Sequence, residues 1–354
     1  MASPLDVDHL RDRVQNVLDH FVDEQREILA RVSDDLEPLA DALTDLLRGG
    51  KRLRPAFCWW GYRGAGGPDN DAALRAAAAL EFLQACALIH DDVMDGSDTR
   101  RGMPSAHHRF ANMHRGAEWR GSPEDFGMGA AILLGDLCLS WADELLLTSG
   151  MPSAAIDAAK RTYDEMRTEL MAGQYLDLLE QARGGGSVER AMRVVRYKSA
   201  KYTIERPLHL GARLAGADDA VVVTYSGYGL PLGEAFQLRD DVLGVFGDPA
   251  ETGKPAGDDL REDKRTVLVA TALDRATAAQ AERLRQHLGD PSLDADGVAL
   301  LREIIADTGA LDHAERLITE LTDQALVALD AVDLVDPTHQ ILTQLAYAAT
   351  RRST

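Results

Sequence analysis

Apolar residues recur at helical spacing along almost the whole chain. They return every three or four positions, as one face of an α-helix requires, in stripes such as Leu10, Val14, Val17, Leu18 and Phe21. Alternation over strand length is scarce, and the β-branched cluster Val221–Val223 follows a helix-start signal at Asp218 and Asp219. Breaker residues separate the long segments, at 64–70, 121–123, 149–152, 184–187, 247–255 and 289–297. With no linker or repeat visible, the pattern predicts one all-α helix bundle over residues 1–354.

Composition and charge narrow the possible functions. The 354 residues include 38 Lys and Arg against 58 Asp and Glu, which gives a net charge of −20. This excess of negative charge argues against nucleic-acid binding and against an anionic membrane surface as main partner. The three cysteines, Cys58, Cys86 and Cys138, lie in apolar stretches, which fits a reducing compartment. The acidic N-terminus does not resemble a signal peptide, and no apolar run approaches a transmembrane segment, so we expect a cytoplasmic protein.

An acidic motif ends the predicted helix that begins near Asp71. Asp91 and Asp95 are four residues apart and therefore share a helix face, with Asp92 about 100° away. Oxygen-rich clusters suit divalent cations, and magnesium prefers one or two carboxylates together with substrate phosphates. A solvated helix end is the alternative, but the preceding residues 83–89 are strongly apolar. The motif therefore predicts a metal site at the rim of a buried helix.

A second acidic pair, Asp240 and Asp241, also ends an apolar helical segment. If the two helix ends face one another, their carboxylates would line one cavity and collect magnesium ions and a diphosphate. Cations cluster near both motifs, and arginine and lysine are the side chains that bind phosphate oxygens. These cations are Lys51, Arg52, Arg54, Arg100, Arg101, Lys198, Lys201, Lys254 and Lys264.

Other chemistries lack support in the sequence. The glycines at 129–135 are not followed by the Lys-Ser/Thr of a phosphate loop, and neither HExxH nor CxxC occurs. No serine has a nucleophile-elbow context. His90, His107, His108 and His114 are not expected to bind a metal, because the residues after Arg101 are interpreted as a flexible loop. Residues 112–127, polar and rich in glycine, are likewise predicted to be a mobile loop.

Several motifs in order resemble one family, the trans-isoprenyl diphosphate synthases or polyprenyl synthetases. They are GGKRLRP at 49–55, Gln84, HDDVMD at 90–95, RRGMPSAH at 100–107, YKSA at 197–200, QLRDD at 237–241 and TGKP at 252–255. Residues 244–270 are most similar to actinobacterial geranylgeranyl diphosphate synthases. The resemblance implies antiparallel helices around one large central cavity, the isoprenoid synthase fold, usually as a homodimer. It also implies condensation of isopentenyl diphosphate with an allylic diphosphate.

The resemblance assigns roles to the acidic residues by their position in the motifs. Asp91 and Asp95 would hold magnesium against the allylic diphosphate, and Asp92 would support them. Asp240 would hold a third ion, with Asp241 beside it. The second motif departs from the family's usual DDxxD, because its fifth residue is Gly244, and Asp248 is too far along the chain to replace it. The resemblance implies three magnesium ions. The carboxylate missing at Gly244 bears on the affinity for the third ion.

The resemblance also assigns the polar residues that would contact substrates. Those expected on the allylic diphosphate are Arg100, Lys198 and Lys254. Those expected on the diphosphate of isopentenyl diphosphate are Lys51, Arg54, Gln84 and Arg101. Ser199 and Gln237 match positions near the reacting carbons, and Lys264 matches a basic residue that closes the site.

Two small residues carry the prediction of product length. In the family, bulky side chains four and five positions before the first aspartate form the floor for a fifteen-carbon product, and here these positions are Ala87 and Cys86. A deeper floor, near Phe82, Leu83 or a facing helix, favours geranylgeranyl diphosphate with twenty carbons, with a farnesyl or longer product as alternatives.

Three other functions would require different sequence features. A class I terpene cyclase would carry a different second motif and would not need GGKRLRP for a second diphosphate. A non-catalytic subunit of a heteromeric synthase would be expected to lose aspartates or cations. A structural helical protein would not bind diphosphates with magnesium. The basic pair Arg351 and Arg352 near the C-terminus is either a cover for the isopentenyl diphosphate site or a frayed tail.

Overall fold

The computed structural model describes residues 4–184, 186–248, 257–290, 292–331 and 334–351. The first half of the chain comprises η1 (Pro4–His9), α1 (Leu10–Val32), η2 (Asp34–Leu36), α2 (Glu37–Leu47), α3 (Leu53–Gly64), α4 (Asp71–Asp95), β1 (Thr99–Arg100), β2 (Met103–Pro104), α5 (Ala106–Gly116), α6 (Pro123–Leu147) and α7 (Ser153–Arg183). The second half comprises α8 (Val188–Val194), η3 (Val195–Glu205), α9 (Arg206–Leu214), α10 (Asp219–Phe246), α12 (Asp258–Arg261), α13 (Val267–Arg275), α14 (Ala278–His287), α15 (Ala295–Asp307), α16 (Ala310–Leu329) and α17 (Thr338–Thr350). The predicted all-α class is confirmed.

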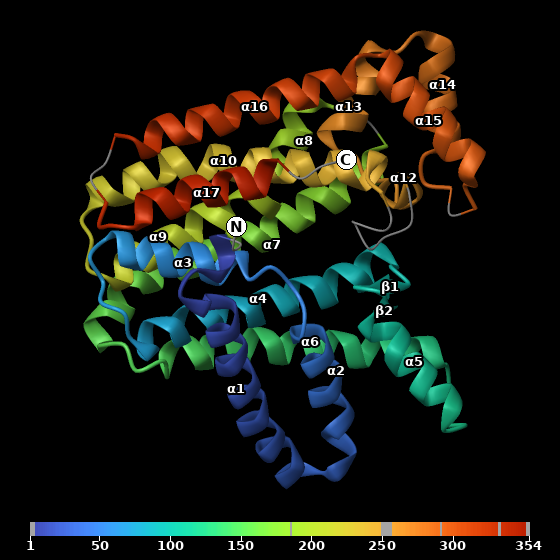
Figure 1. Cartoon of the computed structure of the whole chain (residues 1–354). Helices are drawn as coiled ribbons and strands as arrows, with labels where there is room; N and C mark the ends of the chain where they lie inside the picture. Colours follow the sequence, from blue (N-terminus) through green and yellow to red (C-terminus); the bar gives the residue numbers. More distant parts are fainter. Residues whose placement is uncertain (1–3, 185, 249–256, 291, 332–333, 352–354) are drawn as a thin grey trace.

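Long helices pack side by side in the centre of the molecule (Figure 1). α4 lies along α6, α3 along α9, and α10 lies between η3 and α16. The α1–α2 hairpin projects from one end of the bundle, and α14 and α15 lie at the opposite end (Figure 1). This arrangement leaves α4, α7, η3 and α10 around a common interior, where the functional residues lie.

The predicted breakers end the helices because of local capping chemistry. Asn70 accepts a hydrogen bond from the backbone N–H of Ala73 at 2.8 Å and thereby caps the start of α4. Gly96, with φ of 66°, ends the same helix in the left-handed conformation. Asp218 caps α10, the helix predicted from Asp218 and Asp219. Both acidic motifs therefore stand at the C-terminal end of a long helix.

Two hydrophobic clusters form the core. The larger one contains the fully buried Phe57, Trp59, Trp60 and Phe82, and the smaller one packs α13, α15 and α16 against the end of α10. α10 contributes side chains to both clusters, for example Leu232 to the first and Leu238 to the second. By length and composition α4 could cross a membrane, but 72% of its apolar window is buried inside the bundle.

One helix is wider than an ordinary α-helix in its middle. Between α8 and α9, residues of η3 adopt π-helical hydrogen bonding, which is frequently found at functional sites. A Cβ at Gly173 of α7 would lie 2.4 Å from the backbone N of Lys198, and a Cβ at Gly233 of α10 would lie 2.6 Å from the Cα of Ala200. The wide segment therefore fits between α7 and α10 because glycines face it on both sides.

The expected loop at residues 112–127 is wrong at both ends, because residues 112–116 and 123–127 are helical. α5 continues to Gly116 and α6 begins at Pro123, capped by the side chain of Ser122. The reason is an apolar face that the polar composition concealed: Phe110, Ala111 and His114 are buried, and the α6 backbone approaches α5 closely at Gly127. The turn after Arg100 is also ordered, because Thr99 pairs with Pro104 and Arg100 with Met103 in a two-stranded antiparallel ribbon.

Candidate active site

A cavity of about 680 Å³ lies between α4, α7, η3 and α10. Its size is that of a pocket for a small ligand. Most of the residues predicted from the sequence line it, namely Lys51, Arg54, Gln84, Ala87, Asp91, Arg100, Lys198, Ser199, Gln237, Asp240, Asp241 and Lys264. The structure thus joins both acidic motifs and the basic motifs, which are far apart in sequence, around one space.

Some predicted residues do not line this cavity, and Asp95 of the first acidic motif is one of them. Asp92 is buried and accepts a hydrogen bond from Nε of Arg100 at 3.0 Å. Arg101 donates to the backbone carbonyls of Leu46 and Gly49 at 2.6 and 2.8 Å. Cys86 is fully buried, with its Sγ 3.8 Å from Nδ1 of His90. Lys254 lies outside the described residues, and so does Arg352.

The first acidic motif faces a lysine across the cavity. The Nζ of Lys198 lies 3.2 Å from Asp91 and 2.6 Å from Asp177. Burial, and then the negative charge of Asp91, raises the pKa of Asp95 to about 6. Oδ1 of Asp95 is buried without a hydrogen-bond partner, and Oδ1 of Asp91 is buried with the Lys198 ammonium 3.2 Å away. Buried carboxylate oxygens of this kind are what a divalent cation would satisfy.

The second acidic motif is buried more deeply. Asp241 is 6% exposed, and this burial raises the pKa of its carboxyl group to about 8. The amide of Gln237 donates to Asp241 at 2.8 Å, and Ser199 in turn donates to the Gln237 carbonyl oxygen. This chain of hydrogen bonds fixes the orientation of the Gln237 side chain within the cavity.

Lys264 connects the two acidic motifs electrostatically. Its Nζ lies 2.7 Å from Glu262 and 3.3 Å from Asp259, and its positive charge lowers the pKa of both Asp95 and Asp241 relative to what burial alone would give. Among the described residues, no three carboxylate, imidazole or thiol groups converge on one point to hold an ion by themselves. Such an open set suits magnesium, which keeps several ligand positions for water and phosphate.

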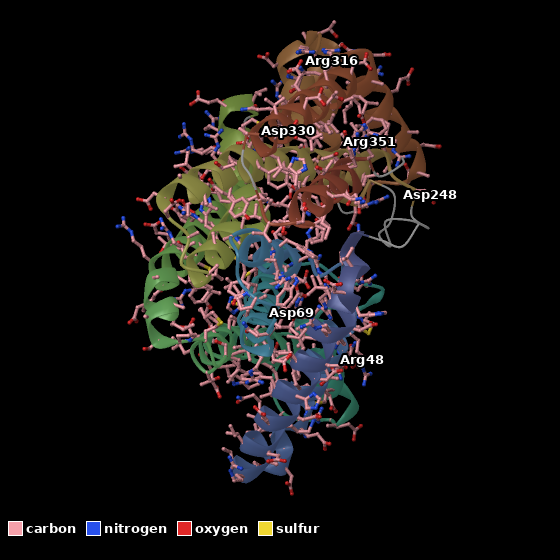
Figure 2. All side chains as sticks on the ribbon, turned by 60° about the vertical axis from the view of Figure 1, so that its left-hand side comes forward. Arg48, Asp69, Asp248, Arg316, Asp330 and Arg351 are labelled. Carbon is pink, nitrogen blue, oxygen red and sulfur yellow. The ribbon has the colours of Figure 1, made fainter. Side chains whose placement is uncertain are left out.

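Asp259, which is not predicted from the sequence, lies next to the position where the second motif lacks a carboxylate. A Cβ at Gly244 would lie 1.8 Å from Oδ2 of Asp259, which also lines the cavity. The Asp259 carboxylate therefore occupies the place where a side chain at position 244 would stand. Asp248, rejected on spacing, is exposed at the edge of the molecule (Figure 2). The available signal was Gly257-Asp258-Asp259, a further acidic pair between Lys254 and Lys264.

The π-helical segment supplies two more unpredicted residues. The hydroxyl of Tyr202 donates to Oε1 of Gln84 at 2.7 Å, and its ring lies 4.1 Å beneath the guanidinium carbon of Arg54. Arg54 also donates to the hydroxyl oxygen of Thr203 at 2.8 Å. Together with Asp177, these side chains hold the predicted cations and the amide of Gln84 in place around the cavity.

Comparison with known proteins identifies the family. The model of the family "Polyprenyl synthetase" matches residues 36–305. Geranylfarnesyl diphosphate synthase of Aeropyrum pernix is 33% identical over 93% of this chain and 96% of its own length. Geranylgeranyl diphosphate synthase of Mycobacterium tuberculosis is 33% identical over 83% of this chain and 79% of its own length.

A solved structure is similar along nearly the whole chain. It is geranylgeranyl pyrophosphate synthase from Corynebacterium glutamicum, complexed with isoprenyl diphosphate and magnesium, with 43% identity and a TM-score of 0.94 over 97% of this chain and 99% of that one. The TM-score shows that the two chains share the same helical fold. The cavity with its two acidic motifs, the family match and these relatives together show that the chain belongs to the polyprenyl synthetase family and is a trans-prenyltransferase.

Proposed function

We propose that this enzyme joins isopentenyl diphosphate to an allylic diphosphate and makes geranylgeranyl diphosphate as its main product. The observation that carries the product length is Ala87, which lines the cavity one helical turn before Asp91 on α4. Its methyl group leaves room for a chain to pass along α4 from the carboxylates. A longer product is the second candidate, because the relatives include geranylfarnesyl diphosphate synthases.

Magnesium would be held by Asp91 and Asp95 on one side and by Asp240 with Asp259 on the other, and we propose three ions in all. The burial of Oδ1 of Asp91 and Oδ1 of Asp95 supports the first half of this assignment, and the position of Asp240 and Asp259 in the lining of the cavity supports the second. Bound magnesium supplies positive charge that stabilises a leaving diphosphate. Asp92 and Asp241 are buried beside these ligands, and we propose that they orient them.

The basic residues divide into two groups. Lys198, Arg100 and Lys264 lie near the acidic motifs and would hold the allylic diphosphate as its carbon–oxygen bond breaks. We assign Lys254 to the same group, because it lies in the TGKP motif. Lys51, Arg54 and Gln84 would hold isopentenyl diphosphate, whose double bond forms the new carbon–carbon bond. Arg101 supports this second group by binding the backbone at Leu46 and Gly49.

Ser199 and Gln237 lie between the two groups, and their hydrogen bond is supported by Asp241. We propose that their oxygen dipoles face the allylic carbon as positive charge develops on it. The proton released from isopentenyl diphosphate leaves with the departing diphosphate. The apolar lining, which includes Ala87, Leu88 and Leu170, keeps water away from the reacting carbons.

We also propose a homodimer, working in the cytoplasm, in which each chain is a single domain. Exposed apolar side chains follow α6 and the turn before it, namely Trp119, Phe126, Met128, Ile132 and Leu133. A patch of this kind on one long helix suits an isologous contact with a second copy. The sharing of α10 by both hydrophobic clusters supports the single domain.

A product assay tests the proposal. The purified enzyme is incubated with magnesium, labelled isopentenyl diphosphate and, separately, dimethylallyl, geranyl or farnesyl diphosphate, and the dephosphorylated products are sized. Twenty carbons are expected. Fifteen carbons would keep the reaction and reject the product assignment, twenty-five or more would favour the second candidate, and no product from any primer would favour a non-catalytic subunit.

A further inference from the structure

Arg52 differs from its neighbours in the Gly49–Pro55 motif. Lys51 and Arg54 line the cavity, whereas Arg52 does not line it and is 4% exposed. A buried arginine without compensation would be costly, so its partners show what it does there. None of the roles proposed above uses this residue.

The Arg52 guanidinium binds three other helices. It forms an ion pair with Glu81 of α4, which is itself 4% exposed. It also donates to the carbonyl of Leu47, the last residue of α2, and to Oε1 of Gln15 of α1 at 2.6 Å. One side chain thus ties the start of α3 to α1, α2 and α4.

The backbone around Arg52 is shaped for this contact. Arg52 has φ of 56°, a left-handed conformation that non-glycine residues rarely adopt, and it follows Gly50 with φ of 108°. On the other side of this turn, Arg101 donates to the carbonyls of Leu46 and Gly49. The turn that contains Lys51 is therefore fixed by the hydrogen bonds of Arg52 on one side and of Arg101 on the other.

Glu81, the α4 residue that pairs with Arg52, lies next to a cavity residue on the same helix. Glu81 precedes Gln84 by three residues, so the two side chains emerge from neighbouring positions on the helix. Gln84 lines the cavity and accepts a hydrogen bond from the hydroxyl of Tyr202. The ring of the same tyrosine packs against the guanidinium of Arg54. The negative charge of Glu81 also neutralises Arg52, which reduces the repulsion among the crowded cations Lys51, Arg54 and Arg101.

We infer that the Arg52–Glu81 ion pair positions Lys51 and Arg54 against Gln84 and thereby sets the affinity for isopentenyl diphosphate. This inference rests on the proposed function of the cavity. Arg52 is a positioning residue, because it acts through its neighbours and does not reach the cavity itself. The allylic half of the site has its own supports, Asp177 and Lys264, so it does not depend on this pair.

The test separates positioning from stability. Removing one partner leaves a buried charge and can unfold the protein, so the informative variant is the double replacement Arg52→Met with Glu81→Leu, which keeps volume and removes both charges. We expect a folded enzyme whose KM for isopentenyl diphosphate rises about tenfold or more, while its KM for the allylic diphosphate changes less than twofold. Arg52→Lys, which keeps the charge but not the planar fork, should lie between this variant and the wild type.

A matched control comes from another ion pair. Arg206 binds Glu169 through two hydrogen bonds of 2.7 and 2.8 Å, and neither residue lines the cavity. Arg206→Met with Glu169→Leu should leave both KM values within twofold of the wild type. Equal changes in the two KM values, or no change for isopentenyl diphosphate in a folded double variant, would overturn the inference. An inactive wild-type enzyme would instead reject the proposed function.

Discussion

The carboxylate of Asp259 stands where a side chain at Gly244 would have to stand, since a Cβ there would approach Oδ2 of Asp259 to 1.8 Å. The two positions are alternatives in space although they belong to different segments, α10 and α12. A carboxylate from another part of the chain therefore lies at the position where the second acidic motif has a glycine.

Replacing Asp259 by Ala should lower kcat/KM about 100-fold and raise the magnesium concentration needed for half-maximal rate, because a carboxylate beside Asp240 is lost. Gly244→Ala should have a comparable effect, because its methyl group displaces Asp259. The measurement is a magnesium titration of the condensation rate. Asp258→Asn is the control, because its carboxylate neighbours Asp259 without lining the cavity. A normal magnesium response in Asp259→Ala would rule out this role.

Asp177 should affect catalysis, because its carboxylate forms an ion pair that orients Lys198. The two side chains lie 2.6 Å apart, and Lys198 also faces Asp91 at 3.2 Å. Lys198→Met should lower kcat by about 100-fold or more, as the loss of a charge-stabilising donor does in other enzymes. Asp177→Asn keeps the shape and should cost less, with KM for the allylic diphosphate rising and KM for isopentenyl diphosphate unchanged. Steady-state kinetics with each substrate varied would check this split, and equal effects on both KM values would contradict it.

The two small residues before Asp91 should not be equivalent. Ala87 lines the cavity, whereas Cys86 is fully buried beside His90. Ala87→Phe should shorten the main product to fifteen carbons. Cys86→Phe should mainly destabilise the fold by about 1–3 kcal/mol through overpacking. Product sizing and thermal unfolding of both variants would decide, and an unchanged product from Ala87→Phe would reject the floor assigned to it.

His209 should make the fold sensitive to acid. Burial lowers the pKa of this imidazole to about 4, and its Nε2 lies 3.0 Å from the hydroxyl of Ser226. Between pH 6.5 and 4 the unfolded chain therefore binds a proton that the folded chain does not, so stability falls as the pH is lowered through this range. The loss should approach about 3 kcal/mol by pH 4.

Urea unfolding of the wild type and of His209→Gln at several pH values measures the effect of that imidazole. The difference in unfolding free energy between the two proteins should shrink or reverse as the pH falls below 6.5. Parallel pH profiles would show that the imidazole does not contribute. Comparing the two proteins removes the contributions of the other titrating groups.

The exposed apolar residues of α6 should form the dimer contact. Leu133→Glu places a charge in the middle of this face, where it would be buried against the second copy. Sedimentation or size-exclusion measurements should show a dimer for the wild type and a monomer for the variant. Val327→Glu, an equally exposed apolar position on α16, is the control and should remain dimeric. A wild-type monomer would reject the proposed contact outright.

Functional residues and helix ends could be predicted from the sequence where they depend on residues close together in the chain. Asp91 was predictable because an acidic run closes an apolar helix, and Asp218 because capping is a local effect. Asp259 was not, because its relation to Gly244 exists only in space. α5 was mistaken for a loop because its apolar face is short and includes a buried histidine, His114. The family resemblance assigns Cys86 and Ala87 to the same floor, but helix rotation directs the two side chains to different surroundings.

The close packing around the π-helical segment limits which substitutions can raise the thermal stability of this enzyme. Replacing helical glycines by alanine is a standard way to stabilise proteins, because it restricts the unfolded chain. At Gly173 and Gly233 the added methyl group would instead meet the backbone next to Lys198 and Ser199. Thermostable variants should therefore come from other sites.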